Sequence, residues 1–176
     1  MHSRVEIQPG FCILWAFLIL TLPMKFLASA MAAAIIHEVC HALAVHLLGG
    51  QILHMSIAAG GMVMEAAGLD TKGECLCALA GPVGSLILAV LPFPMLGLCG
   101  LCQGLFNLLP LMPLDGGRVL GCFLELFCPQ CREKIERVVK ILLLIGAISI
   151  GTWAVILWLC LVFRKFPCKP LGKRVQ

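Results

Sequence analysis

Residues 36–42 read Ile-His-Glu-Val-Cys-His-Ala and place three polar side chains inside an apolar stretch. On an α-helix, residues four apart lie on one face, so His37 and His41 would present their imidazoles to a single point. Zinc binds imidazole nitrogen readily, and a catalytic zinc takes three protein ligands and a water. Glu38 follows the first histidine directly, where it could act as general base on that water without being a ligand. The alternative is a chance occurrence of the motif.

These side chains lie in a chain whose composition indicates an integral membrane protein. The 176 residues are 61% hydrophobic and 12% charged, and the mean hydropathy is +1.04, well outside the range of soluble domains. Charged groups cost about 2.5–3.5 kcal/mol each at the centre of a membrane helix, so a polar cluster there indicates function. The net charge of +4 forms no basic stripe interleaved with aromatics, which predicts a lipid bilayer and no nucleic acid as partner.

We expect an all-α polytopic membrane protein with about five transmembrane helices, because a bilayer core needs about 20 apolar residues per crossing. Residues 28–30, Ala-Ser-Ala, mimic a signal-peptide cleavage site, but a second apolar run follows at once, so an uncleaved first helix is expected. Residues 1–9 are expected to form a short polar tail, and residues 128–140 a solvated charged segment. The predicted spans are residues 11–23, 26–48, 75–91, 95–110 and 141–163.

Between the second and third spans, residues 51–65 predict a small membrane-associated β-hairpin of two short strands around a glycine turn. An exposed sheet edge cannot face lipid, so the hairpin must lie against protein, at the interface or beside a wet cavity. Its edge could receive an extended substrate segment by β-augmentation.

A second informative stretch, residues 107–118, contains two prolines and two glycines that interrupt an apolar pattern. Unwound chain at membrane depth is tolerated only beside protein or a water-filled cavity. Asp115 is the carboxylate of this stretch and the best available third zinc ligand, with Glu65 and Glu74 as rivals. The alternative role for Asp115 is a helix cap. Asn107 offers an amide that could bind substrate backbone or orient a polarised carbonyl.

The eleven cysteines include two C-x-x-C pairs, Cys99/Cys102 and Cys128/Cys131, whose spacing is similar to that of a four-thiolate zinc site. The first pair lies in an apolar run and the second flanks a proline beside charged residues. We interpret the cysteines as reduced thiols, several of them acting as small hydrophobes. His46 is nine residues from His37 and falls on the opposite helix face, so it is expected to be interfacial.

The two motifs, H-E-V-C-H at 37–41 and N-L-L-P-L-M-P-L-D-G at 107–116, resemble the signatures of the site-2 protease family of intramembrane zinc metalloproteases. The second signature of that family is N-x-x-P-x-x-x-x-D-G. The resemblance covers residues 26–120, and the short build looks most like the sporulation protein FB branch of bacterial enzymes. Residues 1–176 would then form a single metalloprotease domain, in which we find neither a PDZ nor a CBS domain. Where the family often has Asn after Gly-Pro in the third span, this chain has Ser85.

The resemblance implies zinc as cofactor, held by His37, His41 and Asp115, with Glu38 activating the bound water. It implies a zinc-dependent endopeptidase that cleaves a membrane-bound protein substrate within or next to a transmembrane segment. The location it implies is the bacterial cytoplasmic membrane, with several crossings. The alternatives are a non-proteolytic membrane metal-binding or scaffold protein, against which the intact Glu38 argues, and a metal transporter. Transport is disfavoured because the polar groups converge on one point and no internal repeat is present.

Overall fold

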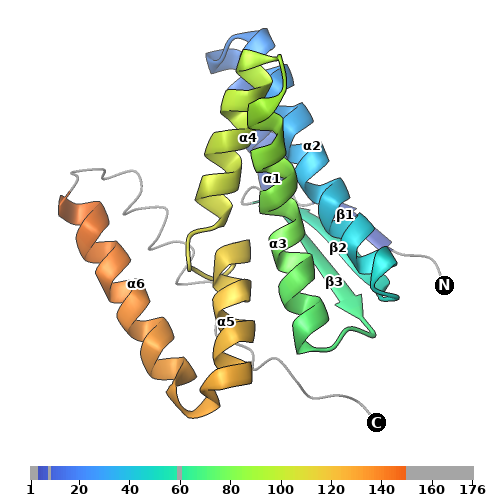
Figure 1. Ribbon diagram of the computed structural model, residues 1–176. Helices are drawn as coiled ribbons and strands as arrows, with labels where there is room; N and C mark the ends of the chain where they lie inside the picture. The colour runs from blue at the N-terminus through green and yellow to red at the C-terminus, as the bar shows by residue number, and fades with distance from the viewer. Residues whose placement is uncertain (1–3, 8, 59–60, 150–176) are drawn as a thin grey trace.

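The computed structural model describes residues 4–7, 9–58 and 61–149 of the chain, which are mostly helical with one small sheet (Figure 1). The predicted last span therefore falls largely outside the described residues. The elements in order are β1 (Arg4–Ile7), α1 (Pro9–Thr21), α2 (Met24–Leu47), β2 (Gln51–Ala58), β3 (Gly61–Ala67), α3 (Thr71–Ile87), α4 (Pro94–Asn107), α5 (Asp115–Phe127) and α6 (Arg132–Ser149), with short 3-10 turns at Leu88–Val90 and Pro129–Cys131.

Helix α3 lies at the centre of the described fold and contacts α2, α4 and α5 (Figure 1). Small residues permit this close packing, as is common between membrane helices. A Cβ atom at Gly100 of α4, for example, would lie 2.6 Å from the carbonyl oxygen of Ser85 on α3. The position of α3 is therefore tightly constrained by backbone contact from its neighbours.

Two described helical segments, Met24–Leu47 and Thr71–Val90, are long and apolar enough to cross a membrane. Helices α1 and α4 have 13 and 14 residues and do not meet that length. The described residues therefore do not confirm five spans. Helix α2 exposes an apolar stripe on one side and buries a second stripe, which carries both histidines of the first motif, against α3. The exposed residues are Met31, Ile35, Val39, Leu43 and Leu47, and the buried ones are Ala33, His37, His41 and Val45.

The predicted hairpin is confirmed: β2 and β3 pair antiparallel, with Ser56 opposite Val63. Helix α2 ends just before it, and Gly49 turns the chain with a φ of +76°, which favours glycine. The membrane association of the hairpin stays a prediction.

The expectation of a polar N-terminal tail was wrong. Residues Arg4–Ile7 form β1, which pairs parallel with β2 and makes a three-stranded sheet in the order β1-β2-β3. These four residues alternate polar and apolar, the period of a strand, and they cover an edge of β2 that would otherwise have unpaired backbone groups.

Most of the charged segment predicted at 128–140 is helical, which the sequence analysis did not specify. Helix α6 begins at Arg132 and continues through the charged residues into the apolar run. Glutamate, lysine and arginine are good helix formers, and oppositely charged residues four apart lie side by side on a helix. Arg132 and Glu136 form such a pair, with Nε and Oε1 3.1 Å apart.

Candidate metal centre

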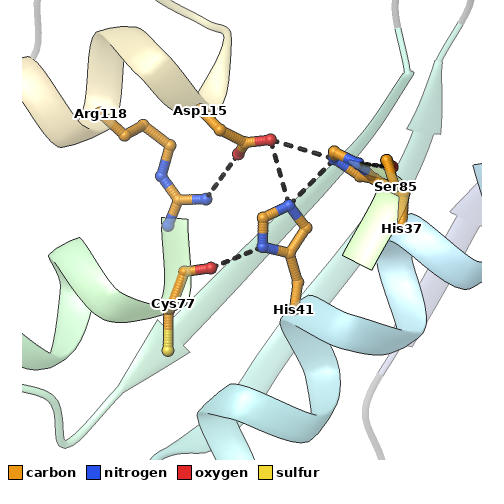
Figure 2. A network of polar contacts seen from close by, with 6 residues as sticks. All are labelled: His37, His41, Cys77, Ser85, Asp115 and Arg118. Atoms are coloured by element: carbon orange, nitrogen blue, oxygen red, sulfur yellow. Dashed lines mark hydrogen bonds and ion pairs between the residues drawn. The ribbon is translucent and has the colours of Figure 1, made fainter. Parts of the chain in front are cut away.

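The two histidines of α2 face the first residue of α5 across the packed helices (Figure 2). The Nε2 atoms of His37 and His41 lie 3.0 and 3.1 Å from Oδ2 of Asp115 and 3.1 Å from each other. All three side chains are buried. His37 and His41 are one helical turn apart, whereas Asp115 follows them by 78 and 74 positions along the chain. The structure thus brings a distant carboxylate to two neighbouring imidazoles.

The other ring nitrogen of each histidine has a partner on α3. Nδ1 of His41 donates to the carbonyl oxygen of Cys77 at 2.7 Å, and Nδ1 of His37 lies 2.8 Å from the hydroxyl oxygen of Ser85. A carbonyl can only accept a hydrogen bond, so neutral His41 carries its proton on Nδ1 and turns the lone pair of Nε2 towards Asp115. Histidines that bind metals are commonly oriented in this way through their second nitrogen.

Helix α3 can approach α2 this closely because Gly81 lies against the His41 ring. A Cβ atom at Gly81 would collide with Nε2 of that imidazole. Cys77, Gly81 and Ser85 are spaced four apart and therefore form one face of α3. Gly81 and Ser85, small residues of the kind that let helices pack closely, thus border the two histidines directly.

Asp115 is placed by the loop between α4 and α5, which folds back on the start of α5. A Cβ atom at Gly116 would collide with the carbonyl group of Leu108, and one at Gly117 would collide with the backbone of Leu111. Leu114 is the N-cap of α5, and no side chain caps the helix there, so the alternative role of Asp115 as a helix cap was wrong.

The two oxygens of Asp115 have different surroundings. Oδ2 faces both histidines, whereas Oδ1 lies 3.6 Å from Nη1 of Arg118, one helical turn further along α5. The side chain of Arg118 is 36% exposed, and that of Asp115 is 10% exposed. The guanidinium therefore approaches the carboxylate from the more open side and leaves the inner oxygen to the histidines.

Glu38 is half-buried on α2, where it directly follows His37. Within the described part of the chain it has no hydrogen-bond or ion-pair partner, which leaves its oxygens available to a small molecule beside the cluster. Asn107, the last residue of α4, is half-buried, and its side-chain amide makes no hydrogen bond to another described residue. Its predicted contact with substrate stays a prediction.

The remaining candidate ligands lie outside this group. Glu65 is exposed on β3, and His46 is exposed near the end of α2. Among the described residues, His37, His41 and Asp115 form the one group of three or more potential ligand side chains, so neither Glu74 nor the C-x-x-C pairs belong to such a group. Cys99 is buried on α4 and Cys102 is exposed, so these two thiols face different surroundings.

The donor set fits a zinc ion. Two imidazole nitrogens and a carboxylate oxygen, all within 4.8 Å of one another, are a known three-ligand set for catalytic zinc. The lone pair of His41 Nε2 and the oxygen of Asp115 are both acceptors, and two acceptors 3.1 Å apart are stable only with a cation or a shared proton beside them. The cluster is therefore built to hold positive charge.

Sequence reasoning missed Ser85, the Cys77 carbonyl, Gly81 and Arg118 as parts of this site. The spacing of four between residues 77, 81 and 85 was the available signal, since it matches the spacing of the two histidines. Arg118 had a weaker signal, because it follows Asp115 by three residues at the start of a helix.

Two comparisons with known proteins found a match, one to a family model and one to a solved structure. The model for Peptidase family M50 matches residues 79–150, which include Ser85 and Asp115 but not the H-E-V-C-H stretch. Among solved structures, the Site-2 Protease from Methanocaldococcus jannaschii is similar, with a TM-score of 0.67 and 19% sequence identity. The similarity covers 100% of this chain and 96% of that one, so the two proteins share a fold. No curated protein matched in a direct sequence search. The family match and the shared fold together support placing this chain in the site-2 protease family, peptidase family M50.

Proposed function

We propose that the chain is a zinc-dependent intramembrane endopeptidase that cleaves a membrane-bound protein within or next to a transmembrane segment, the reaction of regulated intramembrane proteolysis. The M50 family implies a metalloprotease, and the family and fold suggest one that works in the membrane. The observation that carries the proposal is the convergence of His37, His41 and Asp115 on one buried point. Residues 1–176 would act as one catalytic domain, multi-pass in the bacterial cytoplasmic membrane.

In this proposal His37, His41 and Asp115 hold the zinc. A zinc ion bound there would lower the pKa of a bound water towards neutrality and polarise the carbonyl of the scissile bond. The family implies a metal, and the two imidazoles with one carboxylate favour zinc over magnesium or calcium, which prefer oxygen ligands.

Glu38 is the proposed general base. It is next to His37 in sequence, and its half-buried carboxylate has no hydrogen-bond or ion-pair partner among the residues that the structure describes. A base in that position can take a proton from an attacking water and return it to the leaving amine. Asn107 is proposed to hold the substrate backbone through its amide, because it ends α4 where the loop to Asp115 begins.

The substrate class follows from the surroundings of the site. The outer side of α2 exposes an apolar stripe, and lipid or another apolar helix is the environment such a surface requires. A helical substrate hides its amides in hydrogen bonds, so it must unwind locally before cleavage. Strand β3 is at the end of the β1-β2-β3 sheet and could pair with the unwound segment.

The test is a Glu38→Gln variant, purified in detergent beside the wild type. The probe is a fluorophore–quencher peptide with a segment of about 20 apolar residues, enough to span a bilayer. We expect wild-type cleavage, and a loss of about 100-fold or more in the variant with zinc content unchanged, because only the base is removed. Glu133→Gln, an exposed glutamate on α6, is the matched control and should cleave normally. Equal cleavage by Glu38→Gln and the wild type would overturn the proposal, and so would a wild type that binds no zinc.

A further inference from the structure

The two histidines are supported on α3 by groups of different chemistry. His41 has a backbone carbonyl as its partner, which is fixed by the helix and can only accept. His37 has a side-chain hydroxyl, that of Ser85, at 2.8 Å. One support is therefore independent of residue type, whereas the other depends on a single side chain (Figure 2).

We propose that Ser85 is a positioning residue for the metal centre: its hydroxyl oxygen accepts the Nδ1 proton of His37 and so directs the Nε2 lone pair towards Asp115. The inference rests on the proposed function, because it concerns how a metal ligand is held. It assigns a role to a position that the sequence resemblance left without one.

The contact between Ser85 and His37 is important because both side chains are buried. Ser85 is 0% exposed and His37 is 2% exposed, so neither group can exchange its partner for bulk water. Among the described residues, the hydroxyl of Ser85 bonds to His37 alone. Removing the hydroxyl would leave a buried ring nitrogen unpaired, which is unfavourable and would let the ring turn or change its tautomer.

The location of Ser85 is also firmly set. Its backbone carbonyl is in close contact with α4, where a Cβ atom at Gly100 would lie 2.6 Å away. Its neighbour Gly84 lies against Cys40 of α2, so closely that a Cβ atom there would collide with the thiol. The hydroxyl is thus held on a rigid segment between two helices, the property required of a group that fixes the direction of a ligand.

A hydroxyl has one further advantage over a carbonyl at this position. It can donate to Nδ1 when the proton of His37 is on Nε2, and it can accept from Nδ1 when Nε2 binds a cation. His37 can therefore keep its buried hydrogen bond in both tautomers, which the carbonyl of Cys77 does not allow for His41.

The experiment compares zinc affinity, by competition with a chelator of known affinity, in the wild type and in Ser85→Ala, Ser85→Thr and Ser29→Ala. Ser29 is the matched control, since its hydroxyl donates to the Lys25 carbonyl within α2 at 2.9 Å and to no other described residue. We expect Ser85→Ala to bind zinc about 10–100-fold more weakly, the usual effect of losing an outer partner of a ligand. Ser85→Thr, which keeps the hydroxyl, should recover most of the affinity, and Ser29→Ala should match the wild type.

A second readout is the ¹⁵N spectrum of the two imidazoles, and its first part uses only the wild type. In zinc-loaded wild type, the ¹⁵N resonances of His37 should show a proton on Nδ1 and metal on Nε2. In Ser85→Ala the resonances of His37 should change while those of His41 stay in place, a pattern that general loosening of the fold would not give.

Zinc ligated through Nδ1 of His37 in the wild type would overturn the inference. So would wild-type zinc affinity in Ser85→Ala, and in that case the proposed protease function would stand. A wild type without zinc affinity would remove both together, so the two failures can be told apart.

Discussion

The metal centre combines two regions that are built in different ways. Helix α2 supplies His37 and His41 from a regular helix, in which the spacing of four alone puts both rings on one side. Asp115, by contrast, is the first residue of α5, and its position depends on the irregular loop that packs against the start of that helix. The helical half of the site is thus set by local geometry, and the loop half by tertiary contacts. Substitutions in the two halves should therefore differ in how they change zinc affinity and fold stability.

The largest expected effect is at the ligand that the loop supplies. Asp115→Ala removes the carboxylate that both histidines face, and we expect zinc affinity to fall by more than about 100-fold, beyond the effect of losing an outer partner. Zinc content of purified protein, measured by elemental analysis, should drop from about one per chain to a trace. Full retention of zinc would show that another carboxylate or a thiol is the third ligand.

The next effect concerns the loop itself. A methyl group at Gly116 must displace the carbonyl of Leu108, which is backbone and cannot rotate away. We expect Gly116→Ala to lower the free energy of unfolding by about 1–3 kcal/mol and to weaken zinc binding. Both are measured by thermal unfolding in detergent with and without zinc. Gly121→Ala on the same helix is the control, since its nearest contact is a side-chain nitrogen of Arg132 at 3.4 Å. Equal stability of the two variants would show that the loop is not pressed against α5.

In the helical half of the site, Gly81→Ala should weaken zinc binding with only a small loss of fold stability. The new methyl would meet the His41 imidazole, a side chain that can rotate, so the fold should lose less stability than in Gly116→Ala. Zinc affinity should still fall by about 10-fold or more, because the ring leaves the orientation set by Cys77. Gly146→Ala on α6, where the added atom would meet nothing within 4 Å, is the control. Unchanged zinc affinity in Gly81→Ala would contradict the packing described for α3.

The same contrast explains what the sequence could predict. His37, Glu38 and His41 follow from one spacing in one helix, and the hairpin follows from two short strands around a glycine turn. The spacing of Cys77 and Ser85 puts them on one face of α3, but their role as supports could not be derived, because it depends on which face of α3 meets α2. The tail that became β1 was missed because its partner, β2, is about 50 residues away. Contacts between distant segments thus decided the features that the sequence did not predict.

The smallest expected effect is at Arg118, where the two halves of the site meet solvent. Its guanidinium is 3.6 Å from the outer oxygen of Asp115 and is partly exposed, and ion pairs of that kind contribute only about 0–1 kcal/mol. Arg118→Gln should therefore weaken zinc binding by no more than about 5-fold, and added salt should reduce the difference from the wild type. Chelator competition at low and high ionic strength measures this, with the exposed Arg137→Gln on α6 as control. A loss as large as that of Asp115→Ala would mean that Arg118 fixes the carboxylate in place, and the loop would then not be what positions the third ligand.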